Sequence, residues 1–180
     1  MSGNAWREVR EYNTLPAIDA ILADYLKPMV LLTLNTGLKG GEAFNLCWPD
    51  IDFQRNQLSV EGTTAKSGQT RRIPLNTEVQ AIFKSWGEQS DTEYIFASPV
   101  TRERFDKIKR SWGALRARAG LPDFWSHELR HTFASKLVMS GQDLYLVKEL
   151  LGQPTIQMTE RYAHLTPDHK ISAVEMLVTK

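Results

Sequence analysis

Apolar residues recur at helical spacing through the first part of the chain and predict three helices. The first covers residues 14–25, with Thr14 as its cap. A second is predicted over residues 28–37, where a glycine closes the apolar run. A short helix is predicted over residues 42–46, directly after two glycines.

The period then changes from helical spacing to strict alternation. Apolar residues alternate with polar ones in three short runs, namely Ile51 and Phe53, Leu58 and Val60, and Ile73 and Leu75. Arg55-Asn56 and Ser67-Gly68 supply turn residues between these runs. The pattern predicts a small antiparallel sheet of three short strands.

Helical spacing resumes after the sheet. One helix is predicted over residues 77–86, and a strongly charged one over residues 101–119. Another is capped by Ser126 and stopped by Gly141, and further helices end at Gly152, near His164 and near the C-terminus. Because no repeat or flexible linker divides the chain, we expect one α+β domain over residues 1–180 that is mostly helical with a small three-stranded antiparallel sheet.

The net charge of the 180 residues is +1, which by itself does not indicate a nucleic-acid partner. Residues 101–120, however, hold seven basic and two acidic side chains, a net charge of +5, so the other 160 residues sum to −4. Such a segment is as often a solvated helix face as a surface that follows phosphates.

The remaining composition favours a cytoplasmic protein without a bound metal. Cys47 is the only cysteine, which excludes an intramolecular disulfide, and its apolar neighbours indicate a buried thiol. The longest apolar stretch, residues 29–34, is too short to cross a membrane. His131, His164 and His169 lack the acidic partners of a metal site, and we expect structural or exposed histidines, one of them packed beside Arg130.

His127 and Arg130 are the first candidates for chemistry. They lie three residues apart in the first turns of the helix capped by Ser126, where the helix N-terminus favours an anion. An imidazole and a guanidinium on one side could hold a phosphate. Alone, this pair is a weak indication, and an ordinary surface pair is the better interpretation.

Several short motifs in order give a more specific indication. The segment His127-Glu128-Leu129-Arg130-His131-Thr132-Phe133-Ala134-Ser135 is followed by Leu151-Gly152-Gln153 and by Thr159-Glu160-Arg161-Tyr162. Upstream lie Thr36-Gly37-Leu38-Lys39-Gly40-Gly41-Glu42, Leu46-Cys47-Trp48-Pro49-Asp50-Ile51-Asp52, and Thr64-Ala65-Lys66 before Arg71-Arg72-Ile73-Pro74-Leu75. Over residues 14–168 the chain resembles the tyrosine recombinase (phage integrase) family.

The resemblance implies the DNA breaking-rejoining fold and DNA strand cleavage without a metal or other cofactor. Tyr162 would attack the scissile phosphate to give a 3′-phosphotyrosyl enzyme and a free 5′-hydroxyl. Arg130 would hold nonbridging oxygens, His127 would assist proton movement, and Lys66 would protonate the departing oxygen. Glu42 would be the acidic residue that orients its neighbours.

Two positions depart from the family pattern. Lys39 stands where the family has its first catalytic arginine, and lysine lacks the planar fork that holds two phosphate oxygens. Gln153 stands where the family usually has a histidine, and glutamine can donate a hydrogen bond but cannot carry a proton. These departures leave open an alternative, a catalytically impaired DNA-binding or assembly module of integrase ancestry.

The resemblance also implies double-stranded DNA as a partner and a tetramer assembled on it, with no membrane. The predicted DNA contacts are Arg71, Arg72, Arg102, Arg104, Lys107, Lys109 and Arg110. For Arg71 and Arg72, phosphate or strand contacts are expected rather than replacement of the missing arginine. Because only about a dozen residues precede the first predicted helix, we expect the family's N-terminal clamp domain to be absent from this chain.

Overall fold

A small sheet and a bundle of helices share the chain in the computed structural model, which describes residues 25–62, 70–87, 90–98, 101–124 and 126–166. The elements in chain order are α3 (Leu26–Thr36), α4 (Gly40–Phe44), the 3₁₀ turn η2 (Trp48–Asp50), β1 (Ile51–Asp52), β2 (Gln57–Val60), β3 (Arg71–Pro74), α5 (Thr77–Gly87), α6 (Lys109–Arg118), α7 (Ser126–Met139), α8 (Leu144–Leu151), α9 (Gln157–Glu160) and the 3₁₀ turn η3 (Ala163–Leu165). The predicted α+β class with a three-stranded sheet is confirmed.

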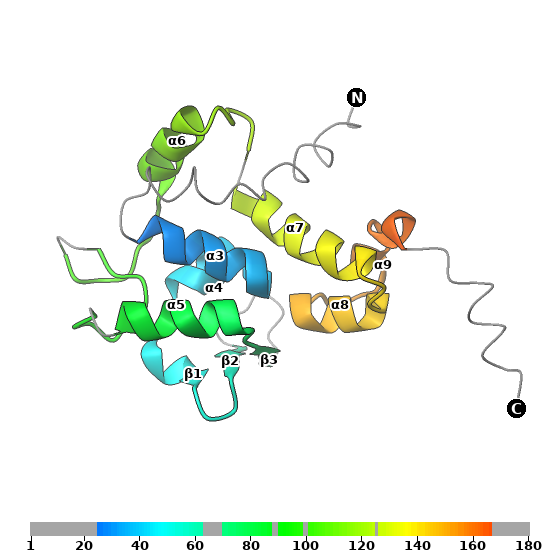
Figure 1. Cartoon of the computed structure of the whole chain (residues 1–180), viewed down its shortest axis with the longest axis horizontal. Helices are drawn as coiled ribbons and strands as arrows, with labels where there is room; N and C mark the ends of the chain where they lie inside the picture. Colours follow the sequence, from blue (N-terminus) through cyan, green and yellow to red (C-terminus); the bar gives the residue numbers. More distant parts are fainter. Residues whose placement is uncertain (1–24, 63–69, 88–89, 99–100, 125, 167–180) are drawn as a thin grey trace, which may run out of the picture.

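The three strands pair in sequence order, β1 with β2 and β2 with β3, and both pairs are antiparallel. Leu58 lies opposite Ile51 on one side and Ile73 on the other, so the three side chains share one face of the sheet. All three are buried, and Val79 and Phe83 of α5 belong to the same core. Figure 1 shows α5 running along this sheet.

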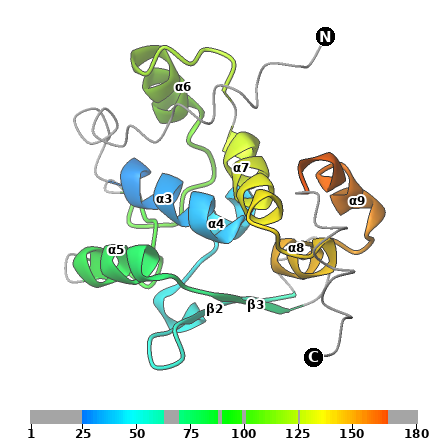
Figure 2. The same ribbon diagram turned by 45° about the vertical axis from the view of Figure 1, so that its right-hand side comes forward.

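Helix α3 lies at the centre of the molecule, with helices on more than one side. Eight of its eleven residues are buried, and it contacts both α5 and α7. Figures 1 and 2 show α3 between α5 below and α6 above, with α4 beside it. A helix that is apolar on most of its surface needs such covering, which explains why its sequence lacks a clear polar face.

Helices α7, α8, α9 and the turn η3 form the second part of the molecule, on the right in Figure 1. Their core consists of Phe133, Ala134, Val138, Val147, Leu151 and Tyr162. Asp143 caps α8 by accepting a hydrogen bond from the Tyr145 amide, and Gly152 ends it with a left-handed conformation, at a φ of 61°. The predicted helix end at Gly152 is confirmed.

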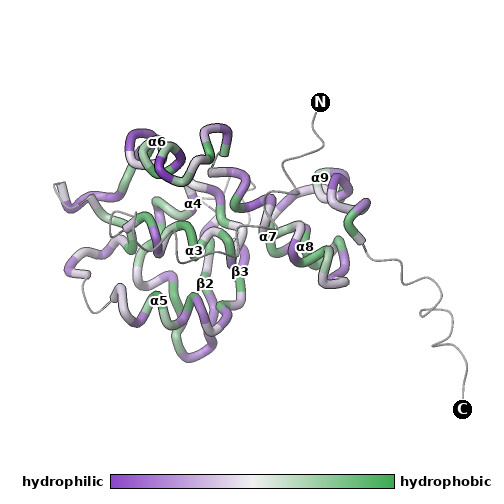
Figure 3. The backbone as a smooth tube through the Cα atoms, turned by 45° about the horizontal axis from the view of Figure 1, so that its top comes forward, coloured by the Kyte–Doolittle hydropathy of each residue, from purple (hydrophilic) through white to green (hydrophobic). Residues whose placement is uncertain are grey.

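The predicted charged helix over residues 101–119 is wrong in its first half, because α6 begins only at Lys109. Arg102 has a φ of 61°, which a right-handed helix does not allow. Ala97 and Arg104 form an isolated antiparallel bridge, so the chain turns between them. Arg102 also pairs with Asp91. Local turn contacts therefore replace the first half of the predicted helix. Figure 3 shows α6 as a largely hydrophilic helix at one edge of the molecule.

Two predicted helix starts also shift. Helix α4 begins at Gly40 rather than at residue 42, because the Glu42 carboxylate accepts a hydrogen bond from the Lys39 amide and so closes the first turn. Ser126 is the first residue of α7 rather than its cap. The predicted helices over residues 14–25 and at the C-terminus, and the turn at 67–68, lie outside the described residues. Within the described residues no helix is both long and apolar enough to cross a membrane.

Candidate active site

Arg130 on α7 joins the ends of two other helices. Its Nη1 donates to the carbonyl of Gly37, 2.5 Å away, and its Nη2 donates to the carbonyl of Leu151, 2.6 Å away. These carbonyls lie at the C-terminal ends of α3 and α8, where backbone acceptors lack partners inside the helix and the helix dipole is negative. Burial lowers the pKa of Arg130 to about 10, so it remains protonated at neutral pH.

This anchoring fixes the plane of the Arg130 guanidinium. The group has five N–H donors, and the two carbonyls engage two of them. Gly37 has a φ of 66°, and a Cβ there would overlap the ring of Phe133. Glycine at this position therefore allows the backbone to approach α7 closely enough for its carbonyl to receive Arg130.

Glu42 on α4 and Arg71 on β3 form a buried ion pair. Arg71 donates Nη2 to Oε2 at 2.8 Å and Nη1 to Oε1 at 3.1 Å, in the bidentate geometry that guanidinium and carboxylate favour. Burial alone raises the pKa of Glu42, but the Arg71 hydrogen bonds and the Lys39 amide reverse this and lower it overall. Glu42 is therefore held as a carboxylate.

The DNA contact predicted for Arg71 does not fit this arrangement. Its side chain is only 9% exposed and also donates Nε to the carbonyl of Leu150. Two consecutive carbonyls at the end of α8, those of Leu150 and Leu151, thus receive the guanidinium groups of Arg71 and Arg130. From its place on β3, Arg71 ties the sheet to α4 and α8.

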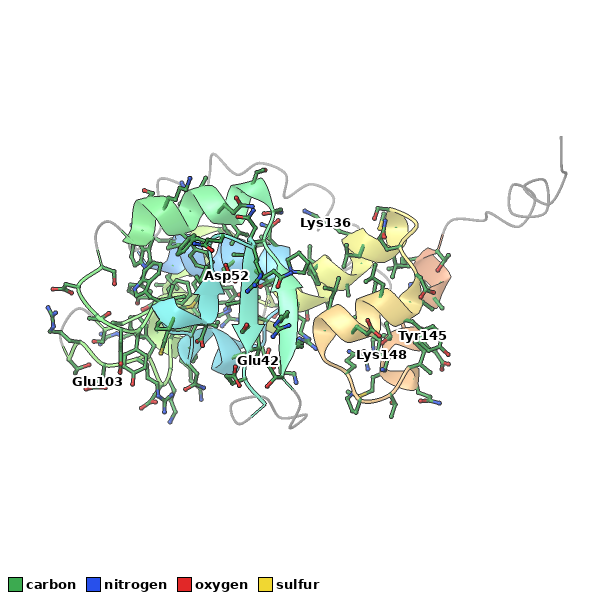
Figure 4. The ribbon with its side chains drawn as sticks, turned by 90° about the horizontal axis from the view of Figure 1, so that it is seen from below. Glu42, Asp52, Glu103, Lys136, Tyr145 and Lys148 are labelled. Carbon is green, nitrogen blue, oxygen red and sulfur yellow. The ribbon has the colours of Figure 1, made fainter. Side chains whose placement is uncertain are left out.

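Lys39 lies beside this ion pair. Its ammonium is 3.8 Å from Oε1 of Glu42, and its side chain is 39% exposed. The Lys39 ammonium is thus partly exposed to solvent and lies close to the Glu42 carboxylate, which also binds Arg71. Figure 4 shows where Glu42 lies relative to the sheet.

Tyr162 follows α9 and packs into the core of the second part of the molecule. It is 2% exposed, and burial raises its pKa. Its hydroxyl lies 2.5 Å from Nδ1 of His131, which belongs to α7. The tyrosine is therefore a protonated phenol whose oxygen meets an imidazole from the helix that also carries Arg130.

The other residues predicted for the site differ in their contacts and exposure. His127 is largely exposed, and its Nε2 lies 2.9 Å from Oε1 of Glu128. Gln153 accepts a hydrogen bond of 2.5 Å from the buried hydroxyl of Thr159, so its amide nitrogen points elsewhere. Arg72 is exposed on β3, and Lys66 lies outside the described residues.

Four of the exposed cations of residues 101–118 lie in two kinds of surroundings. Arg102 and Arg104 pair with Asp91 and Asp106. Lys107 and Lys109 instead line a cavity of roughly 530 Å³ that extends to Gly40, next to Lys39. No cluster of three or more metal-binding side chains occurs among the described residues.

The comparisons with known proteins show the family and the fold. Residues 8–169 match the model of the phage integrase family. The chain belongs to the phage integrase family. The integrase of Salmonella phage P22 is 34% identical over 155 residues, covering 80% of this chain and 40% of that protein. Tyrosine recombinase XerA of Pyrococcus furiosus is 30% identical over 178 residues, covering 94% of this chain and 61% of the relative.

Solved structures of integrase-family proteins share the fold. The catalytic domain of bacteriophage HP1 integrase is 28% identical, with a TM-score of 0.68, over 91% of this chain and 88% of that one. The crystal structure of XerA recombinase is 25% identical, with a TM-score of 0.71, over 92% of this chain and 62% of that one. The chain thus spans between two fifths and two thirds of the length of P22 integrase and XerA.

For this member of the phage integrase family, sequence reasoning missed the position of His131. It expected a histidine packed beside Arg130 without a function, whereas the structure places His131 against Tyr162. One signal was present. His131 lies one helical turn after His127, so the spacing places both histidines on the same face of α7.

Proposed function

We propose that the chain carries out site-specific DNA cleavage and rejoining, as in DNA integration, through a 3′-phosphotyrosyl linkage to Tyr162. The observation that supports this most concerns helix α7. Two backbone carbonyls of other helices anchor Arg130 there, and the next residue, His131, contacts the Tyr162 hydroxyl. A guanidinium of fixed orientation and a phenol at its side are the parts needed to bind and attack a phosphodiester.

The proposed roles follow from the contacts. Arg130 would hold nonbridging phosphate oxygens with the N–H groups that the carbonyls leave available. Lys39 and Gln153 would donate further hydrogen bonds, and Glu42 would keep Lys39 in place through its carboxylate. Lys66 would protonate the 5′-oxygen as it leaves, and His127 would assist proton movement near the phosphate.

Tyr162 must become accessible before it can react. With 2% exposure its side chain is covered, so the residues that cover it must move when DNA arrives. The exposed cations Arg72, Lys107, Lys109 and Arg110 would hold DNA by its phosphates. One structural relative, the Tn1549 transposon integrase, has been solved in complex with a circular intermediate DNA.

The second candidate function is a DNA-binding or assembly module with impaired cleavage. Lys39 favours it, because lysine replaces the forked donor that the family pattern has there. Under this alternative Tyr162 remains in its buried position on DNA, and no covalent product forms.

We propose that the chain assembles as a tetramer on double-stranded DNA in the cytoplasm, without a cofactor. Helix α8 presents exposed apolar side chains, Tyr145 and Leu146, that a second copy could cover. Figure 4 shows Tyr145 and Lys148 on α8 at one end of the molecule. Sedimentation of the chain with and without DNA tests the assembly.

Covalent capture tests the proposal against the alternative. The chain is incubated with a pool of nicked duplexes of randomised sequence, in which a cleaved fragment diffuses away and traps the protein on DNA. Denaturing gels detect the adduct, and sequencing the trapped DNA gives the preferred site. An adduct formed by the wild type and lost in Tyr162→Phe supports cleavage. Absence of adduct from both the wild type and Lys39→Arg, with DNA binding retained, supports the binding module instead.

A further inference from the structure

The contact between His131 and Tyr162 has the geometry of a proton transfer. The two heavy atoms are 2.5 Å apart, and the imidazole ring is tilted 52° to the phenol ring. A short hydrogen bond between a phenol and an imidazole nitrogen brings an acid and its acceptor to the distance at which a proton can move. This arrangement is already present without DNA.

His127 is a poorer acceptor for the same proton in this structure. Its side chain is 63% exposed, and its Nε2 lies beside the Glu128 carboxylate rather than the phenol. Its ring centre is 5.7 Å from that of His131, in an edge-to-face arrangement. His127 is thus one step further from Tyr162 than His131 is.

The surroundings of His131 keep it able to accept a proton. Burial is the largest effect and lowers the pKa of His131 below 6.5. From α7 the Glu128 carboxylate opposes this change, while His127 and Arg130 reinforce it, and from the other side Arg161 reinforces it. His131 is therefore neutral at pH 7, when Tyr162 is a protonated phenol that needs a base.

We propose that His131 is a catalytic residue, the general base that takes the proton of Tyr162 as it attacks the scissile phosphate. This rests on the proposed function. As the Oη–P bond forms and the P–O5′ bond breaks, the phenolic proton passes to Nδ1, and the 5′-oxygen receives a separate proton from the general acid. In rejoining, the 5′-hydroxyl gives its proton to the conjugate base of the general acid as it attacks phosphorus, the Oη–P bond breaks, and the imidazolium returns its proton to the Tyr162 oxygen.

The protonation state of His131 tests the proposal without DNA. Nitrogen NMR of the histidine-labelled chain reports which ring nitrogen carries hydrogen at pH 7. The proposal expects a neutral ring with hydrogen on Nε2 and none on Nδ1. A hydrogen on Nδ1 at pH 7 would overturn it, because His131 would then donate to the phenol and could not act as its base.

Single-turnover cleavage of the best trapped duplex measures the role directly. In His131→Asn an amide oxygen can occupy the place of Nδ1, so the hydrogen bond can persist while proton uptake is lost. The adduct should form at least about a hundredfold more slowly than in the wild type. The wild type is expected to lose rate on acidification below pH 6.5, and this loss should disappear in His131→Asn. His127→Asn should keep that acid limb, and the exposed His164→Asn should react as the wild type does.

A sulfur leaving group separates this proposal from the proposed function. When the 5′-bridging oxygen is replaced by sulfur, the leaving thiolate needs no proton, so Lys66→Ala should be rescued and His131→Asn should not. If His131→Asn cleaves as fast as the wild type with the same pH profile, or faster, the base is not His131. If the wild type forms no adduct, the proposed function fails first and the assignment of His131 falls with it.

Discussion

The buried ion pair between Glu42 and Arg71 holds elements of the site together. Glu42→Gln removes the charge that Arg71 faces, while the guanidinium stays only 9% exposed. Breaking a buried pair from one side leaves the other charge uncompensated, so we expect the free energy of unfolding to fall by about 3 kcal/mol. Urea unfolding measures it.

Asp52→Asn is the matched control for Glu42→Gln. Asp52 also accepts a bond from an arginine, Arg55, but that arginine is 79% exposed. The expected loss of stability is much smaller, because exposed pairs contribute little. Equal losses in the two variants would contradict the structural role of the buried pair.

Lys39 is the residue that sets the cleavage rate if the proposed chemistry holds. Lys39→Arg restores a forked donor beside Glu42 and should raise the single-turnover rate by about a hundredfold. Lys148→Arg on α8 is the control and should change nothing. An unchanged rate in Lys39→Arg would mean that Lys39 does not contact the reacting phosphate.

The sequence predicted residue types better than residue contacts. The motif around Arg130 and Tyr162 identified two side chains that the fold brings near each other. It could not show that Arg71 turns inward to Glu42 or that His131 meets Tyr162, because both contacts join segments 29 and 31 residues apart. Such pairs depend on how elements pack, and a single sequence carries no record of packing.

At the scale of elements, the end of α8 requires glycine. Gly152 has a φ of 61°, and a Cβ there would lie 2.8 Å from Cδ of Arg71. Gly152→Ala should destabilise the chain by about 2 kcal/mol, because it combines a left-handed backbone with a displaced arginine. Thermal unfolding measures the loss.

Gly113→Ala is the control for that substitution. Gly113 lies inside α6 with no atom within 4 Å of an added Cβ. Alanine favours a helix over glycine, so this variant should gain about 0.5–1 kcal/mol. If both variants lose stability alike, the strain at Gly152 does not explain the first result.

The packing of η3 on α7 should depend on pH. Burial lowers the pKa of His131, so below pH 6.5 the unfolded chain binds more protons than the folded one. The free energy of unfolding should therefore fall as the pH decreases from 7.5 through 6.5 towards the lowered pKa of His131. In His131→Asn the fall between pH 7.5 and 5.5 should be smaller. Denaturant unfolding at each pH measures this, and identical pH dependence in both proteins would contradict it.

Most elements could be predicted from local pattern, and the exceptions have local causes. The alternation of Ile51, Leu58 and Ile73 with polar residues sufficed for the sheet, because one face is buried. The helix predicted from residue 101 failed because Arg102 adopts a left-handed conformation. Helical spacing does not indicate a single left-handed residue, so that turn was not visible in the pattern.

At the scale of the whole molecule, the balance of charge predicts how DNA binding responds to salt. The net charge of +1 includes residues 101–120, whose own net charge is +5. DNA binding through this segment releases counterions from DNA. Arg110→Gln should reduce the slope of log affinity against log salt by about one. Arg55→Gln, a similarly exposed change on the sheet turn, is the control. Fluorescence anisotropy at several salt concentrations measures both, and equal slopes for Arg110→Gln and the wild type would exclude that contact.

In the proposed reaction Tyr162 becomes joined to DNA, and mass spectrometry of the trapped adduct tests this. The trapped adduct is digested with protease and nuclease, and mass spectrometry locates the nucleotide-bearing residue. The account predicts a 3′-phosphate linked to Tyr162 alone, with a free 5′-hydroxyl on the released fragment. A nucleotide on any other residue, or a 5′-phosphate linkage, would contradict it.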